Sequence, residues 1–151
     1  MDLEVVDPES PDAVGAIGRY LAELDQRFPT GFDPDAGGQP DLDALRPPAG
    51  AFLIGRLEGR VVGCGGVQRL DDETAEVKRM WVDPGCRGQG LGWRLLARLE
   101  DEARAAGRSR VVLDTNGTLT EAIALYERAG YEPMPRYNDN PYAEHWFAKD
   151  L

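Results

Sequence analysis

A glycine-rich segment behind a strand-like run is the feature that most constrains what this chain can fold into. Residues 76–82 (EVKRMWV) supply β-branched and large apolar side chains, and residues 83–85 (DPG) end the run with turn geometry. Residues 87–92 (RGQGLG) follow and lead into a helical apolar repeat. Glycines let a backbone approach a ligand closely, and the first N–H groups of a helix are unpaired and lie at its positive end. The segment therefore predicts a cradle for a pyrophosphate.

Three other interpretations of the glycines are a tightly packed turn, a dinucleotide fingerprint and a P-loop. A strand-to-helix turn can need glycine for tight packing alone. A dinucleotide fingerprint requires G-x-G-x-x-G, whereas Gly88, Gly90 and Gly92 follow G-x-G-x-G. A P-loop ends in Gly-Lys-Ser/Thr, and Trp93 and Arg94 occupy those places here. Both nucleotide motifs are thus excluded, and the packing interpretation stays open beside the cradle.

One family carries this pattern. Arg87-x-x-Gly90-x-Gly92 resembles the R/Q-x-x-G-x-G/A coenzyme A signature of the GCN5-related N-acetyltransferases (GNAT), and residues 76–82 resemble the strand in front of it. The resemblance continues through residues 113–116 (LDTN) and 125–131 (LYERAGY), and it covers the chain from about Ala51 to the C-terminus. It implies an α/β fold: a single domain over residues 1–151 with a splayed, mostly antiparallel mixed β-sheet flanked by helices.

The resemblance also implies an activity. We expect an N-acetyltransferase that moves the acetyl group of acetyl-CoA, its co-substrate, to a primary amine by direct attack. A non-catalytic module that binds coenzyme A or senses acetyl-CoA is the alternative, and the presence of both Glu76 and Tyr126 argues against it. A domain that uses the fold only to bind a partner would not bind acetyl-CoA at all.

Two residues match positions with catalytic roles in the resembled family. Glu76 precedes Arg87 by the offset at which the histone-acetylating branch carries its glutamate base, although many relatives remove the proton through a water chain. An ordinary strand glutamate paired with Lys78 or Arg79 is the competing interpretation. Tyr126 occupies the tyrosine of the L-Y-x-x-x-G-[YF] pattern, which implies a general acid for the departing thiolate. Its alternative is a tyrosine that only fills the core.

The cofactor contacts that the resemblance implies come from three segments. Main-chain groups of the strand would pair with the pantetheine arm, the glycine segment would hold the pyrophosphate, and an asparagine would contact the arm. The strand side chains are otherwise core residues, and the asparagine is otherwise a turn residue. The predicted cofactor-binding residues are Met80, Trp81, Val82, Arg87, Gly88, Gln89, Gly90, Leu91, Gly92, Trp93 and Asn116.

Composition limits the class of protein. The 151 residues, 42% hydrophobic and 29% charged, suit a soluble globular domain. A net charge of −10 argues against nucleic acid as a partner. No apolar run approaches the roughly 20 residues of a membrane span, and the acidic N-terminus is unlike a signal peptide, so we expect a cytoplasmic protein with no membrane partner. Cys64 and Cys86 lack C-x-x-C spacing and His145 is the only histidine, so no metal site is predicted.

The rest of the chain predicts alternating strands and helices. Strands are expected at 3–6, 51–57, 60–67, 110–114, 131–134 and 144–149, with a parallel pairing around the helix that starts at the cradle. Glycines at 63, 65 and 66 suggest a bulge or a close backbone approach. A first helix is expected from Ser10 and Pro11, with its core face at Val14, Ile17, Leu21, Leu24 and Phe28. Residues 118–121 (TLTE) are a capping-box candidate for a last helix that Gly130 ends.

The acceptor is the part that the sequence describes least. The connection from Thr30 to Gly50 is long and acidic and includes one expected helical turn at 41–45. Its aspartates (Asp33, Asp35, Asp41 and Asp43) and the net charge favour a small cationic amine or an exposed amino group, with a positive charge besides the reacting amine. The alternative is that this charge serves solubility and that the acceptor is neutral or anionic. Candidate lining residues are Phe28, Tyr137, Asn138, Tyr142, His145 and Trp146. A homodimer is compatible with this interpretation.

Overall fold

The computed structural model of the protein describes residues 1–36 and 41–151. Its strands form one seven-stranded sheet in the order β1-β2-β3-β4-β5-β7-β6. The strands are β1 (Asp2–Val6), β2 (Gly50–Leu57), β3 (Arg60–Arg69), β4 (Thr74–Val82), β5 (Arg110–Thr115), β6 (Glu132–Pro133) and β7 (His145–Asp150). The helices are α1 (Pro11–Arg27), α2 (Leu91–Ala105) and α3 (Thr120–Arg128), with short 3-10 turns η1 (Leu42–Leu45) and η2 (Pro84–Cys86). In the described part of the chain, no helix is long and apolar enough to span a membrane.

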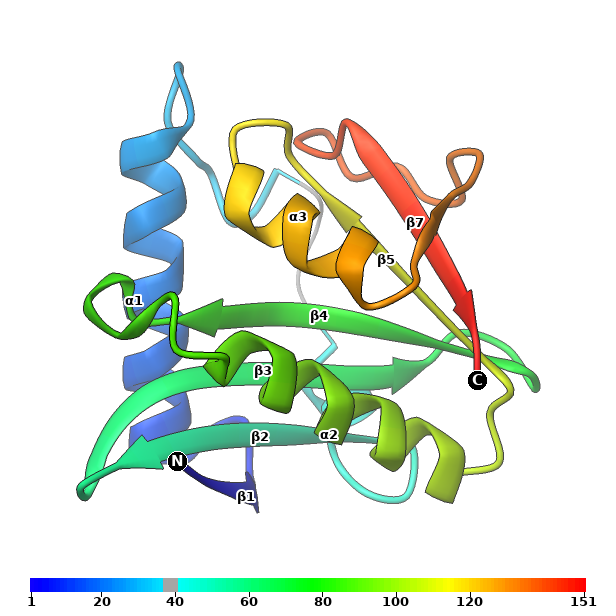
Figure 1. Ribbon diagram of the computed structural model, residues 1–151, viewed down its shortest axis with the longest axis horizontal. Helices are drawn as coiled ribbons and strands as arrows, with labels where there is room; N and C mark the ends of the chain where they lie inside the picture. The colour runs from blue at the N-terminus through cyan, green and yellow to red at the C-terminus, as the bar shows by residue number, and fades with distance from the viewer. Residues whose placement is uncertain (37–40) are drawn as a thin grey trace.

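The sheet opens between its two central strands. Every neighbouring pair is antiparallel except β4 and β5, which run parallel. Pairing of β4 with β5 stops after Glu76 and Val112, whereas β5 continues along β7 as far as Thr115. The two strands then diverge, as Figure 1 shows. This confirms the predicted mixed, mostly antiparallel and splayed sheet, and it leaves the second half of β4 with a free edge toward β5.

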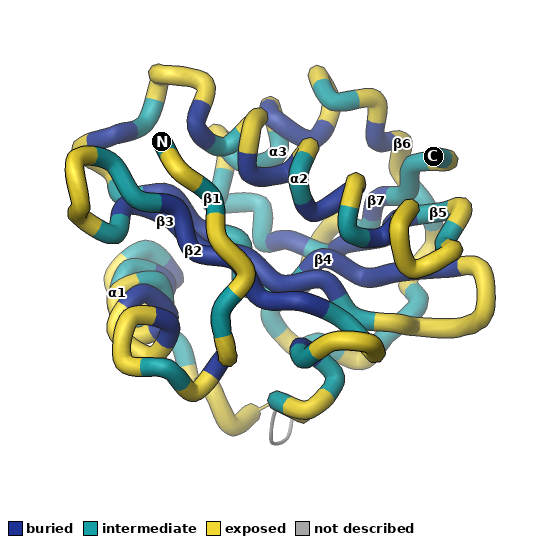
Figure 2. The backbone as a smooth tube through the Cα atoms, turned by 90° about the horizontal axis from the view of Figure 1, so that it is seen from below, coloured by how far each residue is buried: buried dark blue, intermediate teal, exposed yellow. Residues whose placement is uncertain are grey.

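The helices cover the two faces of the sheet. Helices α2 and α3 lie on one face and α1 lies on the other (Figure 2). The predicted core face of α1 is wrong at Val14, whose side chain is 55% exposed. The buried residues of α1 are Ala13, Ala16, Ile17 and Leu24. The small alanines let this helix approach the sheet closely, so its buried stripe is rotated and Val14 lies outside it.

The glycines of β3 lie at a close backbone approach and opposite a bulge, the two features that the sequence suggests. A Cβ atom at Gly65 would lie 2.9 Å from Leu99 Cδ1, so a helix packs directly on the strand there. In the pairing with β4, Cys64 is opposite Trp81 and Gly66 is opposite Lys78. Two residues of β4 thus face Gly65 alone, and the first of them, Arg79, has a φ of 53°. The bulge therefore lies in β4, opposite the glycine, and it reverses which face the following side chains occupy.

One local prediction is confirmed and two differ from the structure. Ser10 is the N-cap residue of α1 and Pro11 is its first residue, although the Ser10 side chain makes no capping hydrogen bond. The capping box at Thr118 is wrong: α3 begins at Thr120, because Asn116 Oδ1 already accepts from the Thr118 N–H at 2.9 Å and from its hydroxyl at 2.8 Å. The strand expected at 131–134 is only two residues long, since prolines at 133 and 135 remove ladder donors.

Candidate active site

The glycine segment, here called the cradle, forms the turn that leads into α2. Gly88 and Gly90 have φ values of 80° and 79°, the left-handed conformation that favours glycine. No described residue accepts a hydrogen bond from the backbone N–H of Gly90, Leu91, Gly92 or Trp93. These groups sit at the positive end of a helix, so they form a ready site for an anion.

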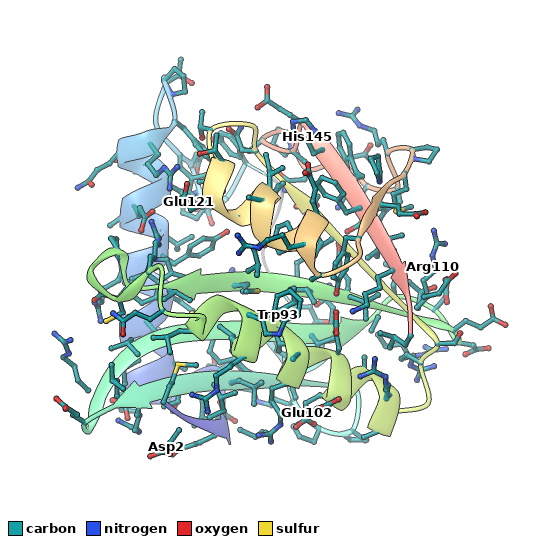
Figure 3. All side chains as sticks on the ribbon, in the orientation of Figure 1. Asp2, Trp93, Glu102, Arg110, Glu121 and His145 are labelled. Atoms are coloured by element: carbon teal, nitrogen blue, oxygen red, sulfur yellow. The ribbon has the colours of Figure 1, made fainter. Side chains whose placement is uncertain are left out.

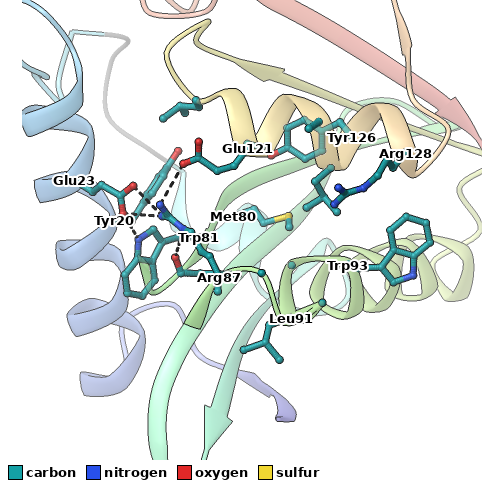
Figure 4. A pocket seen from close by; sticks show the side chains of 18 of the residues that line it. Tyr20, Glu23, Met80, Trp81, Arg87, Leu91, Trp93, Glu121, Tyr126 and Arg128 are labelled. Carbon is teal, nitrogen blue, oxygen red and sulfur yellow. Dashed lines mark hydrogen bonds and ion pairs between the residues drawn. The ribbon is translucent and has the colours of Figure 1, made fainter. Parts of the chain in front are cut away.

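A cavity of about 460 Å³, here called the cradle cavity, lies between the cradle, β4 and α3 (Figure 4). Its lining includes most of the predicted cofactor residues: Met80, Trp81, Val82, Arg87, Gly88, Gly90, Leu91, Gly92 and Trp93. Gln89 belongs to the cradle loop but does not line the cavity, and neither does Asn116. Arg128, on α3, lines it with a guanidinium that has no hydrogen-bond or ion-pair partner among the described residues.

The Arg87 side chain points into the protein. Its Nη2 donates to both carboxylate oxygens of Glu23 at 2.8 Å, and its Nε donates to the Val82 carbonyl at 3.0 Å. The Trp81 indole donates to the same glutamate at 3.0 Å. The guanidinium therefore ties the cradle to α1 and β4. A phosphate contact from this residue would come from its main chain, and the predicted cofactor role of Arg87 stays a prediction.

A second ion pair lies next to the Arg87 side chain, since Glu121 pairs with both Arg27 and Arg87. Arg27 of α1 pairs with Glu121 of α3, and its Nη2 donates to the Thr118 carbonyl at 2.6 Å. The hydrogen bond from Arg27 lowers the pKa of Glu121 to about 2. The pair links helices that lie on opposite faces of the sheet, at the side where β4 and β5 diverge (Figures 1 and 2).

This ion pair predicts an acid-dependent contribution to stability. Because the pKa of Glu121 is depressed in the folded state, its contribution is present above about pH 4.5 and is lost as the pH falls toward 2. We expect Glu121→Gln to be less stable than wild type at pH 7 and the difference to shrink steadily by pH 3, as measured by urea unfolding. Glu127→Gln removes the same charge from an exposed position on α3 and serves as control. A difference that does not depend on pH would refute the ion-pair explanation.

A second cavity of about 470 Å³ extends from the gap toward η1 and the loop before β7. We call it the acidic cavity, since its lining includes Asp33, Asp41, Asp114 and Asp139. Aromatic rings close one side: the ring centroids of Phe32 and Tyr142 are 4.7 Å apart, and those of Phe28 and Tyr142 are 5.5 Å apart.

The predicted acceptor residues divide into two groups. Phe28, Asn138, Tyr142, Asp33 and Asp41 line the acidic cavity. Tyr137, His145, Trp146, Asp35 and Asp43 do not. Asp43 instead pairs with Arg46 at 2.5 Å, and the Trp146 indole donates to Asn138 at 2.9 Å. The expected helical turn is confirmed as η1, with Asp41 as its N-cap.

The two cavities meet in the gap between β4 and β5. The residues that line both are Tyr20, Leu24, Met80, Leu119, Ala122 and Tyr126. Tyr126 is 7% exposed, and its hydroxyl has no hydrogen-bond partner in the described part of the chain. Burial, together with the nearby charge of Asp114, raises the pKa of Tyr126 above its ordinary value. The phenol is therefore a protonated, unengaged donor at the junction.

Glu76 lies beneath the acidic cavity and lines neither cavity. It is 3% exposed, and its carboxylate accepts from the Tyr137 hydroxyl at 2.6 Å and from Gln68 Nε2 at 2.9 Å. Asn138 Nδ2 is 3.4 Å away and Lys78 Nζ is also 3.4 Å away. The carboxylate is thus one side chain removed from the cavity, because Asn138 and Lys78 both line it.

Asn116 lines the acidic cavity, and both the nitrogen and the oxygen of its side-chain amide make hydrogen bonds within the protein. Its Nδ2 donates to the Tyr142 carbonyl at 2.8 Å, while its Oδ1 holds Thr118. Its predicted contact with the cofactor arm stays a prediction.

Four polar residues that line the cavities were not predicted as site residues: Tyr20, Glu23 and Arg128 line the cradle cavity, and Arg79 lines the acidic cavity. Tyr20 was missed because the true buried stripe of α1 is rotated from the predicted one. Arg128 lies in residues 125–131 (LYERAGY), which resemble the family. Its position two residues after Tyr126 could have indicated that it lies near the site. No motif around Glu23 or Arg79 in the sequence indicates a functional role for either residue.

The comparisons with known proteins agree with this geometry. A family described as the acetyltransferase (GNAT) family matches residues 19–131. An IAA acetyltransferase of Azospirillum brasilense is 40% identical over 131 residues, which cover 83% of this chain and 85% of that protein. The N-acetyltransferase YjgM of Escherichia coli, described as uncharacterized, is 35% identical over 127 residues, with coverage of 78% and 75%.

Solved structures show the same fold. An acetyltransferase from Streptococcus agalactiae superposes with a TM-score of 0.79 at 26% identity and covers 99% of this chain and 98% of its own. A GNAT family acetyltransferase from Elizabethkingia anophelis, solved with acetyl-CoA bound, has a TM-score of 0.67 at 17% identity, with coverage of 99% and 97%; at this identity it shows the fold alone. Because the family match and a 40% identical relative both span most of the chain, the protein belongs to the acetyltransferase (GNAT) family and is an N-acetyltransferase.

Proposed function

We propose that the protein transfers the acetyl group of acetyl-CoA, held in the cradle cavity, to a small cationic amine or an exposed amino group in the acidic cavity. The observation that carries this proposal is the junction of the two cavities at Met80 and Tyr126, where the sheet opens. An amine entering from one cavity meets a thioester entering from the other only at this point. A direct attack needs this arrangement.

The chain's own groups fit acetyl-CoA. The unpaired N–H groups at the start of α2 suit the pyrophosphate, and the unpartnered Arg128 guanidinium suits a phosphate at the mouth of the cavity. The free edge of β4 at Met80–Val82 offers main-chain groups to the amides of the pantetheine arm. Trp93 is 49% exposed and projects from α2 beside this cavity (Figures 3 and 4), which suits a stacked adenine. When bound, the co-substrate supplies the activated acetyl group.

Residues of the chain contribute to three steps of the proposed acetyl transfer. A main-chain N–H of β4 at or next to Met80 stabilises the negative charge that develops on the carbonyl oxygen. Tyr126 gives its phenolic proton to the departing sulfur, and its raised pKa keeps that proton in place at neutral pH. The amine must lose a proton before it attacks, because its pKa is about 10.4. Glu76 is the proposed acceptor of that proton, through a water or through the side chains that line the cavity above it.

The test of the proposal is thiol release from acetyl-CoA in a screen of amines, amino acids, aminoglycosides and lysine peptides. Steady release with an amine, accompanied by the acetylated product in a mass spectrum, is expected. Binding of acetyl-CoA without release with any amine would instead support the alternative, a non-catalytic coenzyme A module.

The acidic lining predicts a dependence on charge and salt. We expect Asp33→Asn combined with Asp41→Asn to lower kcat/KM for a diamine about fivefold and to flatten its decline with salt, since exposed charges are screened beyond about 8 Å at physiological ionic strength. Asparagine keeps the oxygen that accepts from the Asp35 and Asp43 N–H groups in wild type. The control replaces Asp2 and Asp150, which lie outside both cavities, by asparagine. If both double variants behave alike, the cavity does not steer the acceptor.

A further inference from the structure

Arg79 carries a guanidinium that the protein itself does not use. Arg79 lines the acidic cavity, and its guanidinium makes no hydrogen bond or ion pair with any residue that the structure describes. Its neighbour Lys78 also lines this cavity, but the ammonium of Lys78 is already paired with Glu76 at 3.4 Å. The two cations in the lining therefore differ: one is balanced by a buried carboxylate and the other is available to a ligand.

The backbone at Arg79 gives a second, independent observation. Arg79 is the first residue of the bulge in β4 and has a φ of 53°, a conformation in which glycine is the usual residue. A bulky side chain held in this region is a feature that clusters at functional sites. The bulge also changes the alternation of the strand, so that Lys78 and Arg79 both line the same cavity.

The position of the guanidinium is consistent with a ligand site close to the reacting centre. Arg79 is followed in β4 by Met80, which lines both cavities at their junction. Burial raises the pKa of the Tyr20 hydroxyl, which also lines both cavities, and the positive charge of Arg79 opposes this rise. A group bound to Arg79 therefore lies within the length of a small molecule from the point where the amine must be placed.

We propose that Arg79 binds a carboxylate of the acceptor, so that the acceptor is an amine that also carries a carboxylate, as an amino acid does. The inference rests on the proposed function and adds the substrate class to it. A guanidinium presents parallel N–H donors that match a carboxylate in two hydrogen bonds. The four aspartates of the same cavity attract the ammonium end of the molecule, and Arg79 binds its other end.

A carboxylate fits this cavity better than a phosphate. The lining holds one unpaired guanidinium and four aspartates, so a single negative charge on the ligand can be balanced, whereas a phosphate monoester brings close to two charges at neutral pH. The volume of about 470 Å³ lies within the range of small-molecule sites.

The experiment compares amines that differ only in the carboxylate. Lysine and cadaverine form one such pair, ornithine and putrescine a second, and phenylalanine and phenethylamine a third. With the 151-residue protein we expect kcat/KM to be about 10- to 100-fold higher for the carboxylate-bearing member of the preferred pair, the range expected for hydrogen bonds to a charged group. A phosphate-bearing amine, phosphoethanolamine, is included against ethanolamine.

Arg79→Gly is the variant of choice, because glycine fits the φ of 53° and the bulge is retained. We expect this variant to keep the wild-type melting temperature or exceed it, to keep its activity on cadaverine, and to lose the preference within each pair. Arg110→Gln removes the same charge from the end of β5 remote from the gap (Figure 3) and should retain the preference.

Three results would overturn the inference that Arg79 binds a carboxylate of the acceptor. Equal or higher kcat/KM for the amines without a carboxylate in wild type would overturn the inference and leave the acetyltransferase proposal intact. A preference that survives in Arg79→Gly would also overturn it, as would a preference for the phosphate-bearing amine. If no amine releases thiol, the proposed function fails first, and this inference fails with it.

Discussion

Replacement of Gly90 by glutamate is expected to raise the dissociation constant for acetyl-CoA by about 100-fold or more. The new carboxylate would stand at the N-cap of α2, beside the N–H groups that have no described acceptor. Like charges about 4 Å apart at a protein surface repel by up to about 4 kcal/mol, and about 2.7 kcal/mol already corresponds to 100-fold. Isothermal titration calorimetry measures this effect directly.

The chain offers a matched control at the other end of the same helix. Gly90 and Gly107 have φ values of 79° and 84°, and at neither position would a Cβ meet any atom within 4 Å. The backbone strain of a glutamate is therefore similar at both, yet Gly107 lies just beyond the C-terminal end of α2. Gly107→Glu should bind acetyl-CoA as wild type does. If a folded Gly90→Glu variant also binds normally, the cradle does not hold the pyrophosphate.

The features that local sequence determines were predictable. The cradle needs glycines between a strand and a helix, and the left-handed φ values of Gly88 and Gly90 are as this pattern requires. The parallel unit around α2 follows from a strand, a helix and a strand in sequence, and it is confirmed by the pairing of β4 with β5. The splay between them came from the family resemblance, since no residue pattern states where a pairing stops.

The partners of charged side chains were not predictable, because they come from distant parts of the chain. Arg87 sits in a phosphate-binding signature, but its guanidinium meets Glu23 of α1. Glu76 occupies the position for which the family resemblance implies a base, but Tyr137 and Asn138 of a late loop donate hydrogen bonds to its carboxylate. The site roles of Arg87 and Glu76 stay predictions, because each depends on tertiary contacts that one sequence does not encode locally.

The bulge in β4 illustrates a second limit. Residues 76–82 read as a continuous strand, in which Val77, Arg79 and Trp81 would share one face. The extra residue opposite Gly65 changes this order, so that Trp81 joins the core beneath α1 while Val77 packs beneath α2. The glycines of β3 signalled an irregularity but not the strand that carries it. The consequence is functional, because the same bulge brings Arg79 to the acidic cavity.

Tyr126→Phe is expected to lower kcat about 100-fold and to leave the affinity for acetyl-CoA unchanged. Loss of a general acid typically costs a factor of 10² to 10⁴, and the ring that lines the cavities is retained. The hydroxyl has no described partner, so its removal should not lower the melting temperature. Since the pKa of Tyr126 is raised above 10, kcat of the wild type should not fall as the pH approaches 10 through loss of this proton.

Tyr131→Phe separates this chemical role from a structural one. The Tyr131 ring lies 6.0 Å from that of Tyr126, and its hydroxyl donates to the buried carboxylate of Glu100 at 2.8 Å. Removing that hydroxyl should destabilise the fold by about 1–3 kcal/mol, because it leaves a buried carboxylate with fewer donors, while kcat stays near wild type. The two variants should therefore give opposite results in kcat and in melting temperature. If Tyr126→Phe turns over as fast as wild type, the proton for the departing thiolate comes from solvent and the phenol only fills the junction.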